Sequence, residues 1–305
     1  MRTYLLKRTF SMFTSLILIF IFSITLFVYL PADYTNNFIM RREDKDVLRK
    51  ELGLDKTKPE QVVHWSKKLA TFDLGNSFAS KKPVNGIVKS VLKNSIPMYI
   101  ISFGVSIILG VILGALAAYK KGAVFDNASR ILVLIGISSP VVVVCTIVMS
   151  LCFYFFKVSV EYFYGTVNNR LTFAFLVLLN IPIFMKYSRG MMIDVLSEDY
   201  IRTAKAKGLG TFKILFKHGI RNSLVGIVGA IGVSLNTMIF TGCLLETILQ
   251  FDGLGALITG ATFKRDYPLM LGGIVVIAFI TVAFNYVFDI AMHIIDPRIR
   301  VAKEG

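Results

Sequence analysis

The stretch IPMYIISFGVSIILGVILGALAA, residues 96–118, decides the fold because it contains no Asp, Glu, Lys, Arg or His. A helix needs about 20 apolar residues to cross the hydrocarbon layer of a membrane, and this stretch is long enough. The whole chain is similar in character, since 55% of its 305 residues are hydrophobic and 17% are charged. Soluble domains contain about 45–50% apolar and about 25% charged residues. The composition therefore indicates a membrane protein and excludes an ordinary soluble enzyme or a disordered chain.

Six such stretches predict an all-α membrane protein with six transmembrane helices. They are residues 10–30, 96–118, 131–156, 171–187, 224–245 and 269–293. The first stretch is longer than the apolar region of a signal peptide and has no small-residue cleavage site after it, so we interpret it as a retained anchor. The fourth is the weakest candidate because it is short and has Pro182 in its interior.

The distribution of Lys and Arg predicts that both termini are cytoplasmic. Segments 1–9, 119–130, 186–223 and 294–305 together carry 17 Lys and Arg, whereas segments 157–170 and 246–268 carry four. Short cytoplasmic loops carry this excess, and a long loop such as 31–95 is translocated regardless of its charge. The predicted parts are 1–30 (N-terminus and first helix), 31–95 (extracytoplasmic loop), 96–293 (five-helix core with a cytoplasmic loop at 188–223) and 294–305 (cytoplasmic tail).

The sequence offers no pattern typical of catalysis. It lacks a phosphate-binding loop and the HExxH, GxSxG and CxxC motifs, and its three cysteines (Cys145, Cys152 and Cys243) lie in apolar runs without metal-ligand spacing. We therefore expect no enzyme activity, no metal site and no cofactor bound by this chain. The net charge of +15 could suggest nucleic acid, but in a chain this apolar we assign it to cytoplasmic loops and anionic lipid.

The predicted helices carry features of a packed bundle. Their central portions lack ionisable residues, which disfavours a carrier that binds a coupling ion at mid-depth. Gly110 and Gly114 share one helix face, where small residues let neighbouring helices approach closely, and Gly226, Ala230 and Ser234 repeat this pattern. Pro140 and Pro182 are expected to bend their helices. Asn285 and Asp289 share a face of the last helix, which we interpret as a structural feature and not a gate.

The loop at 188–223 has the pattern of two short helices. Ser197 is expected to cap a first helix that carries Glu198 and Asp199 in its first turn and ends near Lys207. Gly208 and Gly210 are then expected to end this helix, and Thr211 is expected to cap a second one.

The second helix is predicted to be amphipathic and basic. Its apolar face comprises Phe212, Leu215, Phe216 and Ile220, and a basic stripe of Lys213, Lys217 and Arg221 runs beside it. Such a helix can lie on anionic lipid or dock into a groove of a cytoplasmic partner, and the pattern alone leaves both open.

The spelling of the first helix, DYIRTAKAKGL at 199–209, resembles the cytoplasmic EAA loop of binding-protein-dependent ABC importer permeases, in the form found in the dipeptide, oligopeptide and nickel subfamily. Arg202, Thr203 and Ala204 occupy the EAA triplet, and Gly208 occupies the position of its glycine. Further similar motifs follow in family order: YLLKR at 4–8, DLGNS at 73–77, ETI at 246–248, GLG at 253–255, RDYP at 265–268 and DPRIR at 296–300. Departures are Asp252 before GLG, Leu271 after RDYP, and Met98 and Tyr99 after Pro97.

The resemblance implies a type I ABC importer permease of the bacterial inner membrane, together with its partners. These are a second homologous permease subunit, two cytoplasmic ATPase subunits that use ATP, and an extracytoplasmic solute-binding protein, with peptides as the favoured cargo. The loop would couple the bundle to the ATPases, through Asp199, Arg202, Thr203, Ala204, Lys207, Gly208, Phe212, Lys213, Lys217 and Arg221. Two alternatives stay open, namely a gradient-driven carrier or channel, and a membrane scaffold that transports nothing.

Overall fold

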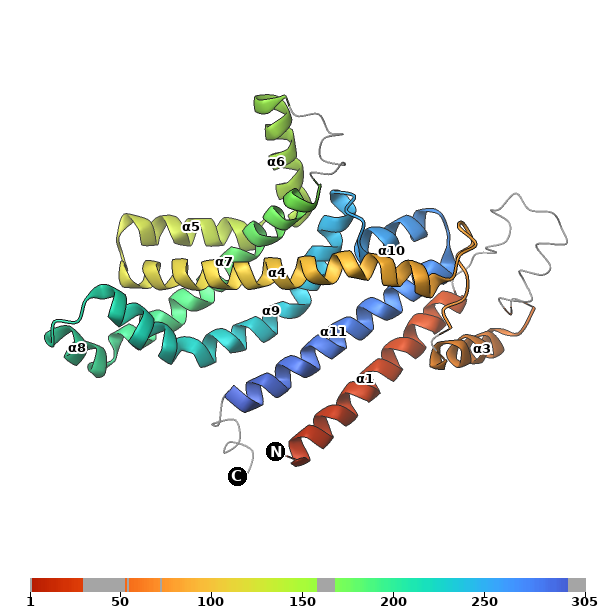
Figure 1. The fold of residues 1–305 in the computed structure, drawn as a ribbon, viewed down its shortest axis with the longest axis horizontal. Helices are drawn as coiled ribbons and strands as arrows, with labels where there is room; N and C mark the ends of the chain where they lie inside the picture. The colour runs from red at the N-terminus through yellow and green to blue at the C-terminus, as the bar shows by residue number, and fades with distance from the viewer. Residues whose placement is uncertain (1, 30–52, 54, 72, 158–167, 296–305) are drawn as a thin grey trace. The chain divides into compact units, whose positions relative to one another are not determined.

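The computed structural model describes residues 2–29, 53, 55–71, 73–157 and 168–295, and the regular elements within these ranges are helices. They are α1 Arg2–Tyr29, α3 Lys58–Ala70, α4 Val84–Tyr119, α5 Val124–Ser138, α6 Val141–Phe156, α7 Asn168–Ser197, α8 Asp199–Ala206, the π-helix η3 Lys213–Ile220, α9 Arg221–Ile248, α10 Leu254–Phe263 and α11 Tyr267–Ile295 (Figure 1). The all-α fold expected from the sequence is confirmed. The segments 31–52 and 296–305 lie outside the described residues, and the second of them contains the motif DPRIR.

The chain forms two compact units. Unit 1 comprises Met1–Ser95 and Asp252–Tyr286, and unit 2 comprises Ile96–Phe251 and Val287–Gly305. The helices α4 and α11 each begin in unit 1 and end in unit 2. The parts predicted from the sequence are separated by the two sides of a membrane and not by compactness. The two units therefore do not test them, and they stay a prediction.

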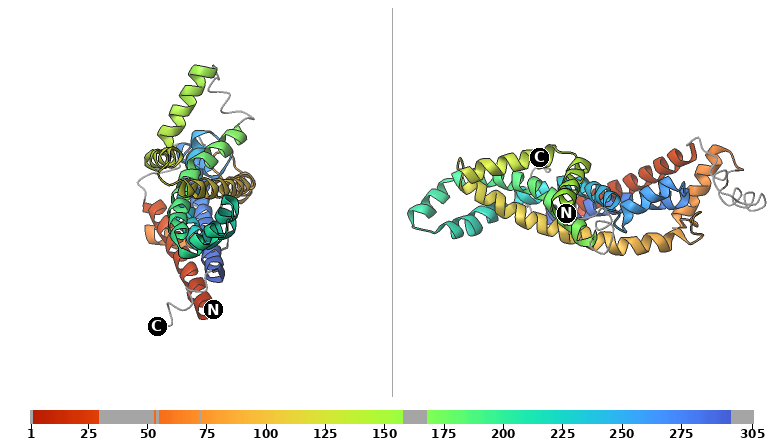
Figure 2. Two further views of the ribbon diagram at one scale, coloured as in Figure 1. Left: turned by 90° about the vertical axis from the view of Figure 1, so that its left-hand side faces the viewer. Right: turned by 90° about the horizontal axis from the view of Figure 1, so that it is seen from above.

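Among the described residues, five helices are long and apolar enough to cross a membrane. They are Leu5–Tyr29, Val84–Tyr119, Asn169–Ser197, Gly226–Ile248 and Tyr267–His293. A sixth crossing requires α5 and α6 together, and these two helices are bent by 110° at the break between them. Figures 1 and 2 show α6 turning away from the end of α5. Pro140 stands at this break as the residue before α6, where the missing N–H of a proline does no harm.

Pro182 has a different place from Pro140, because α7 continues through it as one helix. A Cβ added to Gly136 of α5 would lie 2.5 Å from Cγ of Pro182, so the ring fills the space that this glycine leaves. The proline thus packs against α5, and the bend that the sequence predicts in α7 stays a prediction.

The exposed surface of α1 is apolar. Phe10 is 75% exposed and Phe22 is 68% exposed, on a helix with a continuous apolar sequence. Large apolar side chains are rarely left in contact with water in such numbers, whereas lipid accommodates them at no cost. This surface therefore fits a lipid environment.

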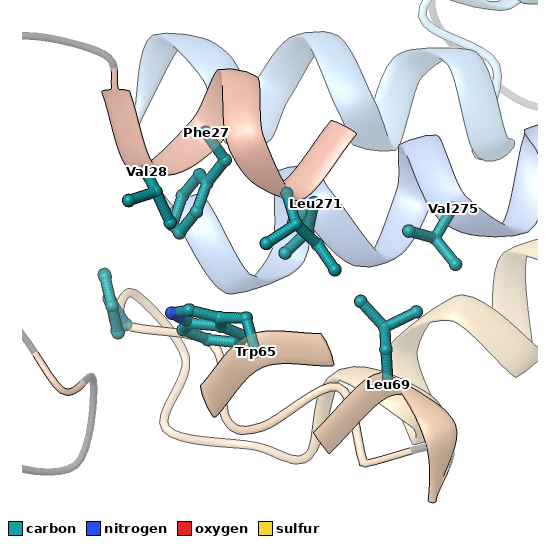
Figure 3. Close-up of a cluster of buried hydrophobic side chains, with 8 residues drawn as sticks. Phe27, Val28, Trp65, Leu69, Leu271 and Val275 are labelled. Carbon is teal, nitrogen blue, oxygen red and sulfur yellow. The ribbon is translucent and has the colours of Figure 1, made fainter. Parts of the chain in front are cut away.

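In unit 1, α3 packs its apolar face on α1 and α11 (Figure 3). Trp65, the only tryptophan of the chain, lies edge-on to Phe27 with ring centroids 5.6 Å apart. Lys58, in the first turn of α3, donates to the backbone carbonyl of Val28 at 2.6 Å. Leu271, which the sequence analysis noted as a departure from the family, is 2% exposed and lies in this cluster. The cluster anchors α3 to both long helices of the unit.

A buried carboxylate joins two of the sequence motifs in unit 1. Asp266, of the motif RDYP, accepts hydrogen bonds from Oγ of Ser77 at 2.5 Å and from the backbone N–H groups of Phe78 and Ala79 at 3.0 and 3.1 Å. Ser77 ends the motif DLGNS. Motifs almost two hundred positions apart therefore form one buried hydrogen-bonded cluster beside the start of α11.

In unit 2, α4 and α7 approach closely at two glycines. A Cβ added to Gly110 would lie 2.6 Å from Cβ of Phe184, and one added to Gly114 would lie 2.6 Å from the carbonyl oxygen of Met185. Ser188 uses this proximity, since its Oγ donates to the carbonyl of Val111 across the two helices at 2.9 Å. The small-residue face that the sequence indicates is thus where the α4 and α7 backbones meet.

Candidate functional site

The loop between α7 and α9 contains α8 and η3, and we call residues 198–220 the α8–η3 segment. Ile201 and Ala204 on the inner face of α8 are buried at 0% and 7% exposure. Asp199, Arg202, Thr203 and Lys207 are exposed. The helix is therefore fixed along one face and presents a polar face outward.

Gly208 ends α8 in the way that the sequence predicts. Its φ is +74°, in the left-handed region that glycine adopts without strain, and Leu209 then donates its N–H to the carbonyl of Ala204 at 3.3 Å. Gly210 has no such φ. A side chain at either position would meet nothing within 4 Å, so backbone conformation alone distinguishes the two glycines.

The predicted cap at Ser197 is wrong. Ser197 is the last residue of α7, and its Oγ donates to the carbonyl of Asp194 at 2.7 Å within that helix. Glu198 takes the N-cap position instead, with extended backbone at φ −68° and ψ 148°. The reason is that α7 extends further than its apolar run, so only one residue separates it from α8.

The predicted cap at Thr211 is also wrong. Residues 211 and 212 are already helical, and η3 continues directly into α9 without a break. The hydroxyl of Thr211 pairs with the hydroxyl of Tyr119 at 2.9 Å, which ties the start of η3 to the end of α4.

The π-helical winding of η3 changes the predicted apolar face. Ile214 and Leu215 are each 2% exposed, whereas Phe212 is 72% and Phe216 38% exposed. The two phenylalanine rings stack on each other with centroids 4.4 Å apart. A helix with more than 3.6 residues per turn moves these residues away from the face predicted for a regular α-helix. The predicted apolar face is therefore divided between a buried and an exposed part.

The exposed side of the α8–η3 segment combines this aromatic pair with basic residues. Lys213, Lys217 and the following Arg221 are all exposed. Arg202 makes a weak ion pair with Asp199 at 3.4 Å on the exposed face of α8. Asn222 donates to the hydroxyl of Tyr200 at 3.0 Å, which links α8 to the start of α9. The exposed side of the segment is therefore a basic and partly aromatic surface. Its chemistry is suited to an acidic or amphipathic partner.

The inner face of the segment is attached to the bundle of unit 2. Leu215 packs in a buried cluster with Met192, Ala115 and Ala118. A Cβ added to Gly219 would lie 2.5 Å from Cε of Met192, so η3 approaches α7 closely. The inner face of the segment is therefore packed on both α7 and α4.

Sequence reasoning missed one charged pair close to this segment. Asp126, in the first turn of α5, is 1% exposed and forms a bidentate ion pair with Arg189 of α7. An acidic residue just before an apolar run, and an arginine just after another, were the available signals.

Asn285 and Asp289 are half-buried on α11, and they fall in different units. Their interpretation as structural residues stays a prediction. In the part of the chain that the structure describes, no group of three His, Cys, Asp or Glu could hold a metal ion. Cys145 is buried and Cys243 half-buried, both as free thiols.

Comparisons with known proteins cover almost the whole chain. Residues 110–301 match the model of the binding-protein-dependent transport system inner membrane component, and residues 1–100 match the N-terminal model of the same class of membrane component. The chain is 32% identical to the "Probable peptide ABC transporter permease protein y4tP" of Sinorhizobium fredii, over 98% of this chain and 100% of that protein. It is 29% identical to the dipeptide transport system permease protein DppB of Bacillus subtilis, over 100% of both chains.

Proposed function

The chain belongs to the family of binding-protein-dependent transport system inner membrane components, and on this premise we propose that it forms half of the pathway of an ATP-driven peptide importer. The other half is a second permease subunit. Two ATPase subunits attach on the cytoplasmic side, and a solute-binding protein delivers cargo from outside. Both termini lie in the cytoplasm in this arrangement.

The observation that supports the proposal most strongly is the mounting of the α8–η3 segment. A coupling element needs one face fixed to the moving helices and another face free for the partner that drives it. Ile201, Ala204 and Leu215 provide the fixed face, and Phe212 and Phe216 lie on the free face. The segment meets both requirements.

The mechanism follows from this arrangement. ATP binding closes the ATPase subunits, which move the α8–η3 segment that rests on them. Because Leu215 and Gly219 pack on α7, this movement reaches the membrane helices as a displacement of α7 and its neighbour α4. The pathway then opens to the outside, and ATP hydrolysis by the partners resets it. This chain binds no cofactor of its own.

The names of the relatives favour peptides as the cargo. The protein y4tP is named as a peptide permease and DppB as a dipeptide permease, and both align with this chain over nearly its whole length. We assign a peptide substrate on this ground, with selectivity set mainly by the solute-binding protein.

The experiment that tests the proposal compares Gly208→Val with Gly210→Val in the complete transporter. A β-branched residue at a φ of +74° is strained, so the end of α8 is expected to rearrange in the first variant and to remain in the second. We expect uptake of labelled dipeptide to fall about tenfold in Gly208→Val, with ATP hydrolysis retained. Gly210→Val is expected to transport normally.

Expression of the chain with and without its partner subunits separates the proposed function from the two rival functions. A gradient-driven carrier would take up solute when expressed without ATPase subunits and would lose that uptake with an ionophore. A scaffold would bind the ATPase subunits but take up no solute in any combination of partners. Either result, at normal abundance of the chain, would overturn the proposal.

A further inference from the structure

The ion pair between Asp126 and Arg189 is a bidentate contact within unit 2. Nε of Arg189 donates to Oδ1 of Asp126 at 2.5 Å, and Nη2 donates to Oδ2 at 2.9 Å. The backbone N–H of Gly122 donates to Oδ2 at 2.9 Å, on the turn that precedes α5. The carboxylate is 1% exposed and the arginine side chain 21% exposed. The pair is therefore largely withdrawn from water.

A pair with this geometry fixes direction as well as distance. Two parallel N–H···O bonds hold the planes of the guanidinium and the carboxylate together, which a lysine cannot reproduce. A buried carboxylate is costly without a partner, so Arg189 holds the start of α5 in place, apart from the contact of Gly136 with Pro182 near the other end of the helix. The pair therefore makes the start of α5 follow α7.

The position of Arg189 along α7 connects it to the α8–η3 segment. The helix α7 runs without interruption to Ser197, and α8 begins two residues later at Asp199. Arg189 lies in this last part of α7, next to Ser188, which bonds α4. At positions 188 and 189, α7 is thus fastened to α4 on one side and to α5 on the other.

We propose, resting on the function proposed above, that Asp126 and Arg189 are positioning residues that transmit movement of the α8–η3 segment to α5. The helix α6 follows α5 after the 110° bend. The ion pair therefore governs how α5, and α6 after it, respond to movement of the α8–η3 segment. Without the ion pair, α7 moves with the segment while α5 does not follow, and ATP hydrolysis is no longer matched by transport.

The test measures peptide uptake and ATP hydrolysis in the same vesicles that contain the complete transporter. The variants are Asp126→Asn, Arg189→Lys and the exchange variant Asp126→Arg with Arg189→Asp. Each single substitution is expected to lower the amount of peptide taken up per ATP hydrolysed about tenfold, while ATP hydrolysis itself is retained. This factor corresponds to the loss of one charge-assisted hydrogen bond. The exchange variant is expected to recover a large part of that ratio.

The matched control is Arg130→Gln, which removes an exposed arginine from the same helix. Arg130 donates to the side chain of its neighbour Asn127 and is not part of the buried pair. We expect its uptake per ATP to equal that of the wild type. Single variants with a wild-type ratio at normal abundance, or an exchange variant no better than the single ones, overturn the proposal.

A second measurement keeps the result separate from the proposed function. Spin labels at Val124 of α5 and Gly190 of α7, both exposed, report the distance between the two helices in the purified chain. We expect a narrow distribution with the pair intact and a broad one in Asp126→Asn, whatever the chain transports. An unchanged distribution overturns the positioning role, whereas absence of ATP-driven uptake by the wild type overturns only the proposed function.

Discussion

Asp266 in unit 1 and Asp126 in unit 2 are each 1% exposed, but they are held by different kinds of partner. Asp266 accepts from a hydroxyl and two backbone N–H groups within the short segment 77–79. Asp126 accepts from the backbone N–H of Gly122 and, unlike Asp266, from a guanidinium, that of Arg189 on α7. The first carboxylate organises a turn, whereas the second joins α5 to α7. Substitutions are therefore expected to affect stability in unit 1 and coupling in unit 2.

The largest effect on stability is expected from Asp266→Ala. This change leaves the buried donors of Ser77 and Phe78, and the N–H of the exposed Ala79, without their acceptor, at a cost of about 3–5 kcal/mol in the free energy of unfolding. Thermal unfolding in detergent measures it, with fluorescence of Trp65 as the reporter.

The control for this change is Asp252→Ala. The side chain of Asp252 is exposed, and only its backbone carbonyl is used, as the acceptor for Nδ2 of Asn94 at 2.9 Å. We expect its unfolding to resemble that of the wild type. Equal stabilities of Asp266→Ala and Asp252→Ala would mean that the buried cluster does not hold the turn.

A smaller effect is expected from Gly114→Ala, which tests how the Asp126 pair is brought together. The added Cβ would lie 2.6 Å from the carbonyl oxygen of Met185 and 2.9 Å from the backbone nitrogen of Arg189. Backbone atoms must move apart, so we expect a loss of about 1–3 kcal/mol in stability together with weaker coupling. Uptake per ATP and thermal unfolding are both measured.

Gly104→Ala on the same helix is the matched control. An added Cβ at Gly104 meets nothing within 4 Å, and alanine favours a helix by up to about 1 kcal/mol over glycine. We expect stability equal to or above that of the wild type. If both substitutions behave alike, the close approach of α4 and α7 is not what positions Arg189.

Ser77→Ala tests how much the hydroxyl contributes to the cluster around Asp266, apart from the backbone N–H groups. It removes one donor from Asp266 but leaves both backbone N–H donors, so the expected loss is about 1–2 kcal/mol, well below that of Asp266→Ala. Unfolding followed by Trp65 gives the value. A loss as large as that of Asp266→Ala would show that the hydroxyl dominates the cluster.

The sequence predicts the parts of this molecule that depend on local pattern. Apolar length gave the long helices, the spacing of Gly110 and Gly114 indicated a packing face, and Gly208 marked the end of α8. Each of these features is written in neighbouring residues. The prediction of the fold class needs no more than this.

The features that sequence reasoning missed depend on residues far apart. The segment η3 winds as a π-helix, and Phe212 and Phe216 lie on its exposed side. The pair of Asp126 and Arg189 lies 63 positions apart and exists only because α5 lies beside α7. The residue pattern within one helix predicts neither the winding of η3 nor the pairing of Asp126 with Arg189.

The smallest effect is expected from Glu60→Gln, at the start of α3. Glu60 accepts from the backbone N–H of Thr57 at 2.9 Å at the start of α3, and this bond lowers the pKa of its carboxyl below the ordinary 4.5. A lowered pKa in the folded state stabilises α3 above about pH 4.5, and that contribution is lost as the pH falls through the lowered value. The glutamine variant lacks this pH dependence, so the two proteins are expected to differ slightly at pH 7 and to converge in acid. Trp65 on α3 reports the transition, Asp55→Asn serves as a neighbouring acidic control, and identical pH profiles for wild type and Glu60→Gln would remove the capping role.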